Sequence, residues 1–182
     1  MLTYQKQLKL IVIKMKTKNI LIPLFAILIV SSIAYLWLAP SGALKAPNIN
    51  LQLIDGKKLN LASLQGKPVL ITFWATSCPG CIKEMPHLIE LYEELHSKGL
   101  EIIGIAMPQD RPDYIMEMVK RKKVPYLIAF DLKGEAVKAF GNVSLTPTTF
   151  LIDNKGKIVK KKIGEIKMDV WRKRIISILN KK

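Results

Sequence analysis

The chain contains few of the residues that hold metal ions. Its 182 residues include only two cysteines and two histidines. The cysteines stand two residues apart, a spacing that occurs in half of many zinc sites, but a zinc site normally needs four ligands. No other cysteine is present to complete such a site. We therefore expect no bound metal and no separate cofactor.

Acidic residues are also scarce, and this gives the chain a strong positive charge. It has 14 Asp and Glu residues against 29 Lys and Arg residues, for a net charge of +15. Such an excess could favour anionic lipid headgroups or acidic partners. A lysine-rich, solvated surface is the simpler interpretation, so charge alone assigns no partner.

Charge is absent from one long stretch, residues 20–38, which reads ILIPLFAILIVSSIAYLWL. As a helix it would extend ~28 Å, close to the thickness of the hydrocarbon core of a bilayer. Residues 1–19 carry five lysines and no acid, and such segments stay in the cytoplasm. We therefore predict a single-pass anchor in the cytoplasmic membrane with the rest of the chain on the extracytoplasmic side. Nucleic acid is then not an expected partner.

A cleaved signal peptide is the alternative to an anchor. Ser41 and Ala43 could occupy the small-residue positions of a cleavage site. The apolar stretch is longer than the usual signal core of ~7–15 residues, which favours the anchor. No cysteine stands directly after it, and this excludes a lipoprotein anchor.

The remaining chain reads as a linker and one domain. Residues 39–46, APSGALKA, are small and include Pro and Gly, which is typical of a linker. Residues 47–182 are expected to form a single domain, without internal repeats. The alternating runs of residues 49–64, INLQLIDGKKLNLASL, predict a hairpin around Asp55-Gly56. The run VLITFW predicts a buried strand, followed by a helix from Cys78. The later pattern predicts strand, helix, strand, short helix, hairpin and closing helix, hence a mixed α/β sheet with helices on both faces.

The thiol pair lies at the predicted start of that helix. If Cys78 is the N-cap, then Pro79, Gly80 and Cys81 occupy the first three helical positions. Proline suits the first of these positions, and the N–H groups of the next two can donate to the cap atom. The positive end of the helix dipole also favours a thiolate. We therefore expect a stabilised Cys78 thiolate, which makes the disulfide more oxidising.

Several further motifs surround the cysteines. They are Ala46-Pro47, the Asp55-Gly56 turn, Gly66-Lys67-Pro68-Val69, Phe73-Trp74-Ala75, Glu84-Met85-Pro86 and the later stretch LTPTTFLIDNKGKIV. From about Ala46 to the C-terminus the chain resembles the TlpA/ResA-like branch of the thioredoxin superfamily. The resemblance implies a thioredoxin-like mixed β-sheet flanked by helices, with an added N-terminal β-hairpin and, here, a transmembrane helix.

The resemblance also implies roles for the site residues. Cys78 is the expected nucleophile and Cys81 the resolving thiol, so that the pair forms a redox-active disulfide. Thr146-Pro147 is the expected cis bond beside the thiols, where the family pairs with the substrate backbone. Trp74 is expected to flank the thiols, and Pro79 and Gly80 to face the substrate.

Glu84 is the expected proton carrier. Thioredoxins have a buried Asp two residues before the tryptophan of this strand, and this chain has Thr72 there. ResA-like proteins use a glutamate at the position of Glu84 as an acid and base. The alternative is that Glu84 is an ordinary acid in the first turns of the helix, favoured by the helix dipole.

Together these features predict an extracytoplasmic thiol–disulfide oxidoreductase that acts on protein disulfides and dithiols. The family implies a monomeric reductant, for example of the haem-site cysteines of apocytochrome c. Such a reductant takes its electrons from a membrane thiol donor. The alternatives are a disulfide oxidase or isomerase for exported proteins, and a non-enzymatic metal-binding or docking module. The Pro-Gly spacer, which favours a more oxidising couple, stands against the reductant.

Overall fold

The computed structural model describes residues 23–35 and 44–181. The chain divides into two units, Met1–Gly42 and Ala43–Lys182, which we treat separately. In the first unit, residues 23–35 form a helix. The ends of the predicted anchor at 20–38 and the basic segment 1–19 lie outside the described residues. Among the residues that are described, no helix is both long and apolar enough to cross a membrane.

The second unit alternates strands and helices. Its strands are β1 (Asn50–Leu53), β2 (Lys58–Asn60), β3 (Val69–Trp74), β4 (Glu101–Ala106), β5 (Leu127–Phe130), β6 (Thr148–Ile152) and β7 (Ile158–Ile163). Its helices are α2 (Pro79–Leu95), α3 (Pro112–Lys122), α4 (Glu135–Ala139) and α5 (Met168–Leu179), and two 3-10 helices cover Leu61–Leu64 and His96–Lys98.

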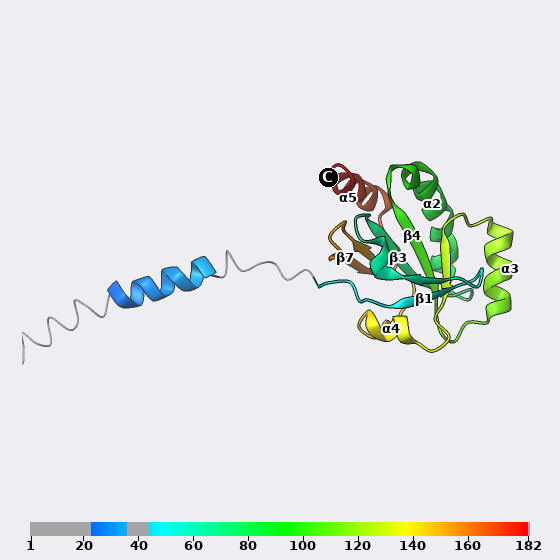
Figure 1. The fold of residues 1–182 in the computed structure, drawn as a ribbon, viewed down its shortest axis with the longest axis horizontal. Helices are drawn as coiled ribbons and strands as arrows, with labels where there is room; N and C mark the ends of the chain where they lie inside the picture. Colours follow the sequence, from blue (N-terminus) through cyan, green and yellow to red (C-terminus); the bar gives the residue numbers. More distant parts are fainter. Residues whose placement is uncertain (1–22, 36–43, 182) are drawn as a thin grey trace, which may run out of the picture. The chain divides into compact units, whose positions relative to one another are not determined.

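The strands form one mixed sheet in the order β2-β1-β5-β4-β3-β6-β7. Strand β4 pairs in parallel with both β3 and β5, and the remaining neighbours pair antiparallel. Figure 1 shows α2 and α5 together along one side of this sheet and α4 on the other. The predicted mixed sheet with flanking helices is therefore confirmed, and the lysine-rich strand β7 lies at its edge.

The core is built on the two central strands. Every residue of β3 and β4 is buried, as expected for strands covered on both faces. Successive side chains of β3 point to opposite faces. Thr72 therefore faces α2, whereas Phe73 packs edge-to-face against Phe140 and Phe150. The C-terminal end of β3 leads directly into the cysteine motif, so the packed core fixes the position of the thiols.

Two local features differ from the sequence interpretation. The run Leu61–Leu64, read as part of the hairpin, is a 3-10 helix in which the Asn60 side chain accepts a hydrogen bond from the N–H of Ala62 at 2.9 Å. A local side-chain cap of this kind competes with strand pairing. In the segment predicted as a linker, Ala46 N–H donates to the carbonyl of Gly156 at 2.8 Å.

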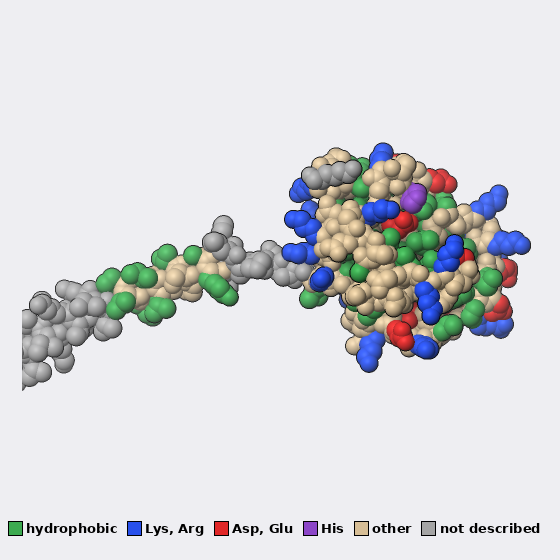
Figure 2. All heavy atoms as spheres, in the orientation of Figure 1, with side chains coloured by type: hydrophobic (Ala, Val, Ile, Leu, Met, Phe, Trp, Pro, Cys, Tyr) green, Lys and Arg blue, Asp and Glu red, His purple; other side chains and the backbone are tan. Residues whose placement is uncertain are grey.

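The basic side chains are distributed over the surface. Figure 2 shows Lys and Arg side chains around the whole visible face of the second unit, with Asp and Glu among them. They do not gather into one stripe on this face. This distribution is typical of a solvated lysine-rich surface.

Candidate active site

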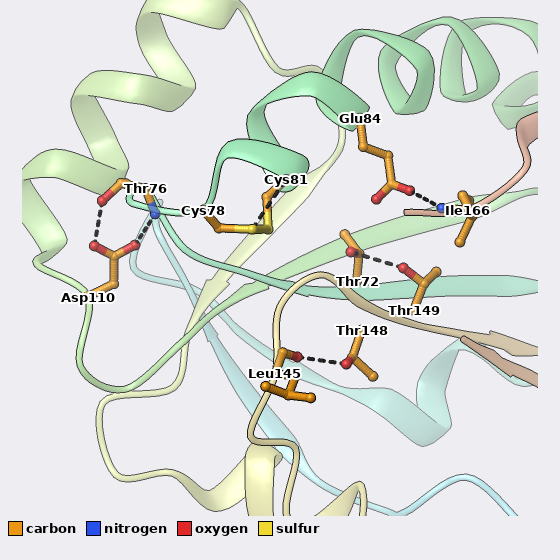
Figure 3. Close-up of a disulfide and its surroundings, with 10 residues drawn as sticks. All are labelled: Thr72, Thr76, Cys78, Cys81, Glu84, Asp110, Leu145, Thr148, Thr149 and Ile166. Atoms are coloured by element: carbon orange, nitrogen blue, oxygen red, sulfur yellow. Dashed lines mark hydrogen bonds between the residues drawn. A yellow bond between two sulfur atoms is a disulfide. The ribbon is translucent and has the colours of Figure 1, made fainter. Parts of the chain in front are cut away.

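The two cysteines form a disulfide at the start of α2. Their Cα atoms are 5.3 Å apart, and both side chains are buried. Cys78 is the N-cap with extended backbone angles, and Pro79 occupies the first helical turn. The predicted register of the motif on the helix is therefore confirmed, and Figure 3 shows the disulfide at the end of the helix above the sheet.

One of the two predicted donors reaches the Cys78 sulfur. The N–H of Cys81 donates to Cys78 Sγ at 3.2 Å. The N–H of Gly80, which we also expected to donate, makes no hydrogen bond to this sulfur in the disulfide form. A disulfide sulfur is tied to its partner and cannot sit freely over both amides. The prediction of two donors concerns the reduced Cys78 thiolate, and it stays a prediction.

A carboxylate that follows the neighbouring parallel strand, at the same edge of the sheet, holds the loop before Cys78. Asp110, which follows β4, accepts hydrogen bonds from the N–H and from the hydroxyl of Thr76, both at 2.6 Å. It also accepts from the N–H of Arg111 at 3.0 Å. Because Thr76 lies two residues before Cys78, these bonds fix the approach of the chain to the nucleophile (Figure 3).

Asp110→Ala should loosen this loop. Loss of the two bonds to Thr76 is expected to lower the free energy of unfolding by about 1–2 kcal/mol, because hydrogen bonds to charged groups are worth more than neutral ones but this group is partly exposed. Urea unfolding measures the loss. The matched control is Asp113→Ala, which removes an exposed carboxylate bound to Arg111 and should change stability little. Equal stability of both variants would contradict the role of Asp110.

Glu84 lies further along α2, on the side that faces the sheet. Its side chain is only 4% exposed, and its Oε1 accepts a hydrogen bond from the N–H of Ile166 at 2.7 Å. Burial raises the pKa of Glu84 above its ordinary value; the Ile166 bond opposes this rise, the charge of Glu165 adds to it and His87 lowers it. A buried carboxyl with a raised pKa suits proton transfer better than an ordinary surface acid does.

The sheet carries hydroxyl groups where thioredoxins have the buried Asp. Thr72 is buried, and its hydroxyl accepts a hydrogen bond from the hydroxyl of Thr149 on β6 at 3.2 Å. Neither hydroxyl ionises near neutral pH. Glu84 is thus the buried carboxyl that α2 presents near the thiols, in the place where the sequence led us to look.

The proline segment before β6 has the backbone form that the resemblance implied. The Thr146-Pro147 peptide bond is cis, and Pro147 is buried. Its carbonyl accepts a hydrogen bond from Gly164 at 2.7 Å. A side chain built on Gly80 would lie 3.5 Å from Pro147 Cδ, so the proline borders the turn between the cysteines.

Trp74 is buried at the end of β3. Its indole Nε1 lies beside Gly104 on β4, 3.1 Å from where a side chain at that glycine would begin. This nitrogen has no hydrogen-bond partner. The indole thus covers β4, and its contact with the thiols stays a prediction.

Sequence reasoning missed Asp110 and the segment around Ile166. Asp110 follows a buried strand that pairs in parallel with β3, and the carboxyl ends of neighbouring parallel strands meet at one edge of a sheet. That rule could have pointed to it. Nothing in the sequence signals that the backbone of Ile166 returns to Glu84, because 82 residues separate them.

Among residues 23–35 and 44–181, no group of three or more His, Cys, Asp and Glu side chains is placed to hold a metal ion. The redox-active group of the site is the disulfide itself. Together, the sheet order, the disulfide at a helix N-terminus and the adjacent cis-proline define a thioredoxin-fold oxidoreductase.

Comparison with known proteins agrees with this class. Residues 42–174 match the Redoxin family model, and the chain belongs to this family. It is 40% identical over 122 residues to a protein of Bacillus thuringiensis subsp. konkukian named thiol-disulfide oxidoreductase ResA, covering 66% of this chain and 69% of the relative. Its identity to the ResA of Bacillus subtilis is 35% over 115 residues, covering 63% of each chain.

Solved structures show the same fold. A thiol:disulfide interchange protein of the thioredoxin family from Chlorobium tepidum superposes with a TM-score of 0.68 at 26% identity, covering 74% of this chain and 95% of that chain. StoA from Bacillus subtilis superposes with a TM-score of 0.60 at 26% identity, covering 70% and 97%.

Proposed function

We propose that the protein is an extracytoplasmic reductant of disulfides in protein substrates. The observation that carries the proposal is the Cys78–Cys81 disulfide at the N-terminus of α2 with the buried Glu84 one turn beyond it. A disulfide in this position can be opened and closed without disturbing the core, because it joins only the first turn of one helix. The relatives named ResA support the same activity.

The reaction is a two-electron thiol–disulfide exchange. In the reduced protein the Cys78 thiolate attacks one sulfur of the target disulfide, and the other target sulfur leaves as a thiolate and takes up a proton. The Cys81 thiol then loses its proton and attacks Cys78 Sγ. This releases the second target thiol and forms the Cys78–Cys81 disulfide. The target gains two electrons, which the two protein sulfurs lose, and two protons, of which one is given up by Cys81 and the other comes from solvent because Cys78 reacts as the thiolate.

Glu84 is suited to the proton in the second step. Its position one helical turn after Cys81 places it on the same side of α2. In its charged form it can accept the proton of the Cys81 thiol, and a raised pKa brings that exchange closer to neutral pH. The Ile166 N–H holds one carboxyl oxygen and leaves the other for this transfer.

The N-terminal residues support a membrane-anchored location. We propose that residues 20–38 form an uncleaved anchor with residues 1–19 in the cytoplasm and the domain outside. An oxidised reductant on that side needs a membrane thiol donor to reduce it again, and apocytochrome c is a candidate substrate. Cleavage of the domain by protease added to protoplasts or spheroplasts, together with release of the undigested protein from membranes by detergent alone, tests the location; protection from the protease or cytosolic recovery would contradict it.

The reduction potential tests the direction of the reaction. Equilibration with glutathione buffers should give a value nearer to that of thioredoxin, about −270 mV, than to that of the oxidant DsbA, about −120 mV. The reduced protein should then reduce an oxidised peptide that carries the two haem-site cysteines. A potential near −120 mV would instead favour the disulfide oxidase.

A further inference from the structure

The segment that joins β7 to α5, residues 164–167, lies against the candidate active site. Three contacts hold it there. Gly164 N–H donates to Pro147 O at 2.7 Å, Ile166 N–H donates to Glu84 Oε1 at 2.7 Å, and Glu165 Oε2 lies 3.0 Å from Lys83 Nζ. Because the residues on both sides of Glu165 are bound through their backbone, one to Pro147 and the other to Glu84, Glu165 lies between the cis-proline and the first turns of α2.

The Glu165 side chain lies over the turn between the cysteines. A side chain built on Gly80 would meet Glu165 Oε1 at 3.4 Å and Glu165 Cγ at 3.5 Å, and Pro147 Cδ at 3.5 Å. Glu165 and Pro147 therefore both lie within van der Waals reach of Gly80. A carboxylate thus stands at the border of the surface on which a target would dock.

This carboxylate remains accessible to a partner. The Glu165 side chain is 48% exposed and that of Lys83 is 74% exposed. Ion pairs between such exposed groups are weak in water and open readily. A cation on a docked target could therefore take the place of Lys83, and the exclusion of water at the docked interface would strengthen the new pair. A target acid in the same place would be repelled.

We propose that Glu165 is a specificity-determining residue that favours target disulfides with Lys or Arg next to the reactive cysteine over those with Asp or Glu. Lys83 competes with the target cation for the same carboxylate. This inference rests on the proposed exchange at Cys78. The preference for basic targets at Glu165 is opposite to the effect of the net charge of the whole chain, +15, which would by itself attract acidic targets.

Two oxidised peptides test the inference, identical except for Lys or Glu beside the reactive cysteine. The measured quantity is the ratio of their kcat/KM values. Glu165→Gln should lower the Lys-to-Glu ratio by about threefold to tenfold. Lys83→Gln should raise it, because Glu165 loses its competing partner. A purely structural role of the ion pair would move the ratio in the same direction in both variants, or not at all.

The matched control is Glu94→Gln. Glu94 also makes an ion pair from α2, with Arg172 of α5 at 2.7 Å, but it lies ten residues beyond Glu84, about 15 Å along the helix. The ratio of kcat/KM values for the two peptides should be the same in Glu94→Gln as in the unmodified protein. An unchanged ratio in Glu165→Gln would overturn the inference while the exchange activity persists. Loss of exchange with both peptides and with a small aromatic disulfide in the unmodified protein would instead overturn the proposed function.

Discussion

Cys81→Ala protein, produced in its native host, is expected to accumulate as a mixed disulfide with its target through Cys78. Cys78 can still attack the target, but no second thiol is present to release it. Turnover of insulin or of a peptide disulfide should fall at least about a thousandfold, since removing a nucleophile or its obligatory partner removes the covalent route. Non-reducing gels followed by mass spectrometry identify the trapped partner.

The control separates trapping at the site from random oxidation. Cys78→Ser in the Cys81→Ala background leaves no thiol in the chain, because the sequence has only two cysteines, and should trap nothing. If Cys81→Ala captured no partner and retained full turnover, the assignment of Cys81 as the resolving thiol would be wrong. Persistence of activity in Cys78→Ser would refute the enzyme mechanism as a whole.

Glu84→Gln is expected to slow the reduction of target disulfides by about a hundredfold, within the range found for general acid–base groups. Glutamine is similar in shape and its amide oxygen can still accept the hydrogen bond from Ile166 N–H, so the fold should persist. The loss should be largest near neutral pH, where the unmodified carboxylate can take the Cys81 proton, and smaller at high pH, where the thiol ionises without help. Stopped-flow quenching of tryptophan fluorescence would measure both.

Stability gives an independent readout of the same group. Because the folded protein raises the pKa of Glu84, the neutral carboxyl is favoured in the fold. Its contribution is fully present below the unfolded-state pKa and is lost as pH rises through the higher folded-state pKa. The free energy of unfolding of the unmodified protein should therefore fall, relative to that of Glu84→Gln, as pH rises from acid toward neutral.

The exposed Glu90 on the same helix supplies the control for both readouts. It faces His87 at 3.7 Å, and its side chain is 64% exposed. Glu90→Gln should leave both the rate and the pH dependence of stability nearly unchanged. Equal rates for Glu84→Gln and the unmodified protein would show that Glu84 has no role in proton transfer. Glu84 would then be an ordinary acid in the first turns of the helix, the alternative that the sequence left open.

Local patterns predicted most of the fold. The continuous apolar runs of β3 and β4 identified the central strands, since only strands covered on both faces read in this way. The Pro at the first turn of α2 and the cysteine before it set the helix register. Both signals depend on neighbours in sequence. The run Leu61–Leu64 was misread because its alternation also suits a 3-10 turn that a side chain caps.

The parts of the site that the sequence did not predict depend on distant chain segments. Asp110 meets Thr76 across 34 residues, and Ile166 meets Glu84 across 82. No periodicity links such pairs, because their proximity results from strand order and from the path of a connecting loop. Gly80 illustrates the same limit: the sequence identified it only as the source of an N–H donor, whereas in the fold the Glu165 side chain also lies against it.

The hydrogen bond from Ile166 to Glu84 has a consequence for attempts to redesign the protein. One carboxyl both serves the proposed chemistry and fastens the start of the last helix to the helix that carries the cysteines. Changes at position 84 other than glutamine, whose amide oxygen can still accept this hydrogen bond, therefore alter reactivity and attachment together. Because Ile166 binds this carboxyl through its backbone N–H and packs its side chain into the core, the side chain can be varied to adjust the attachment while the carboxyl is left intact. Reactivity and helix attachment can therefore be changed separately by substitutions at Ile166, which takes no part in the proposed chemistry.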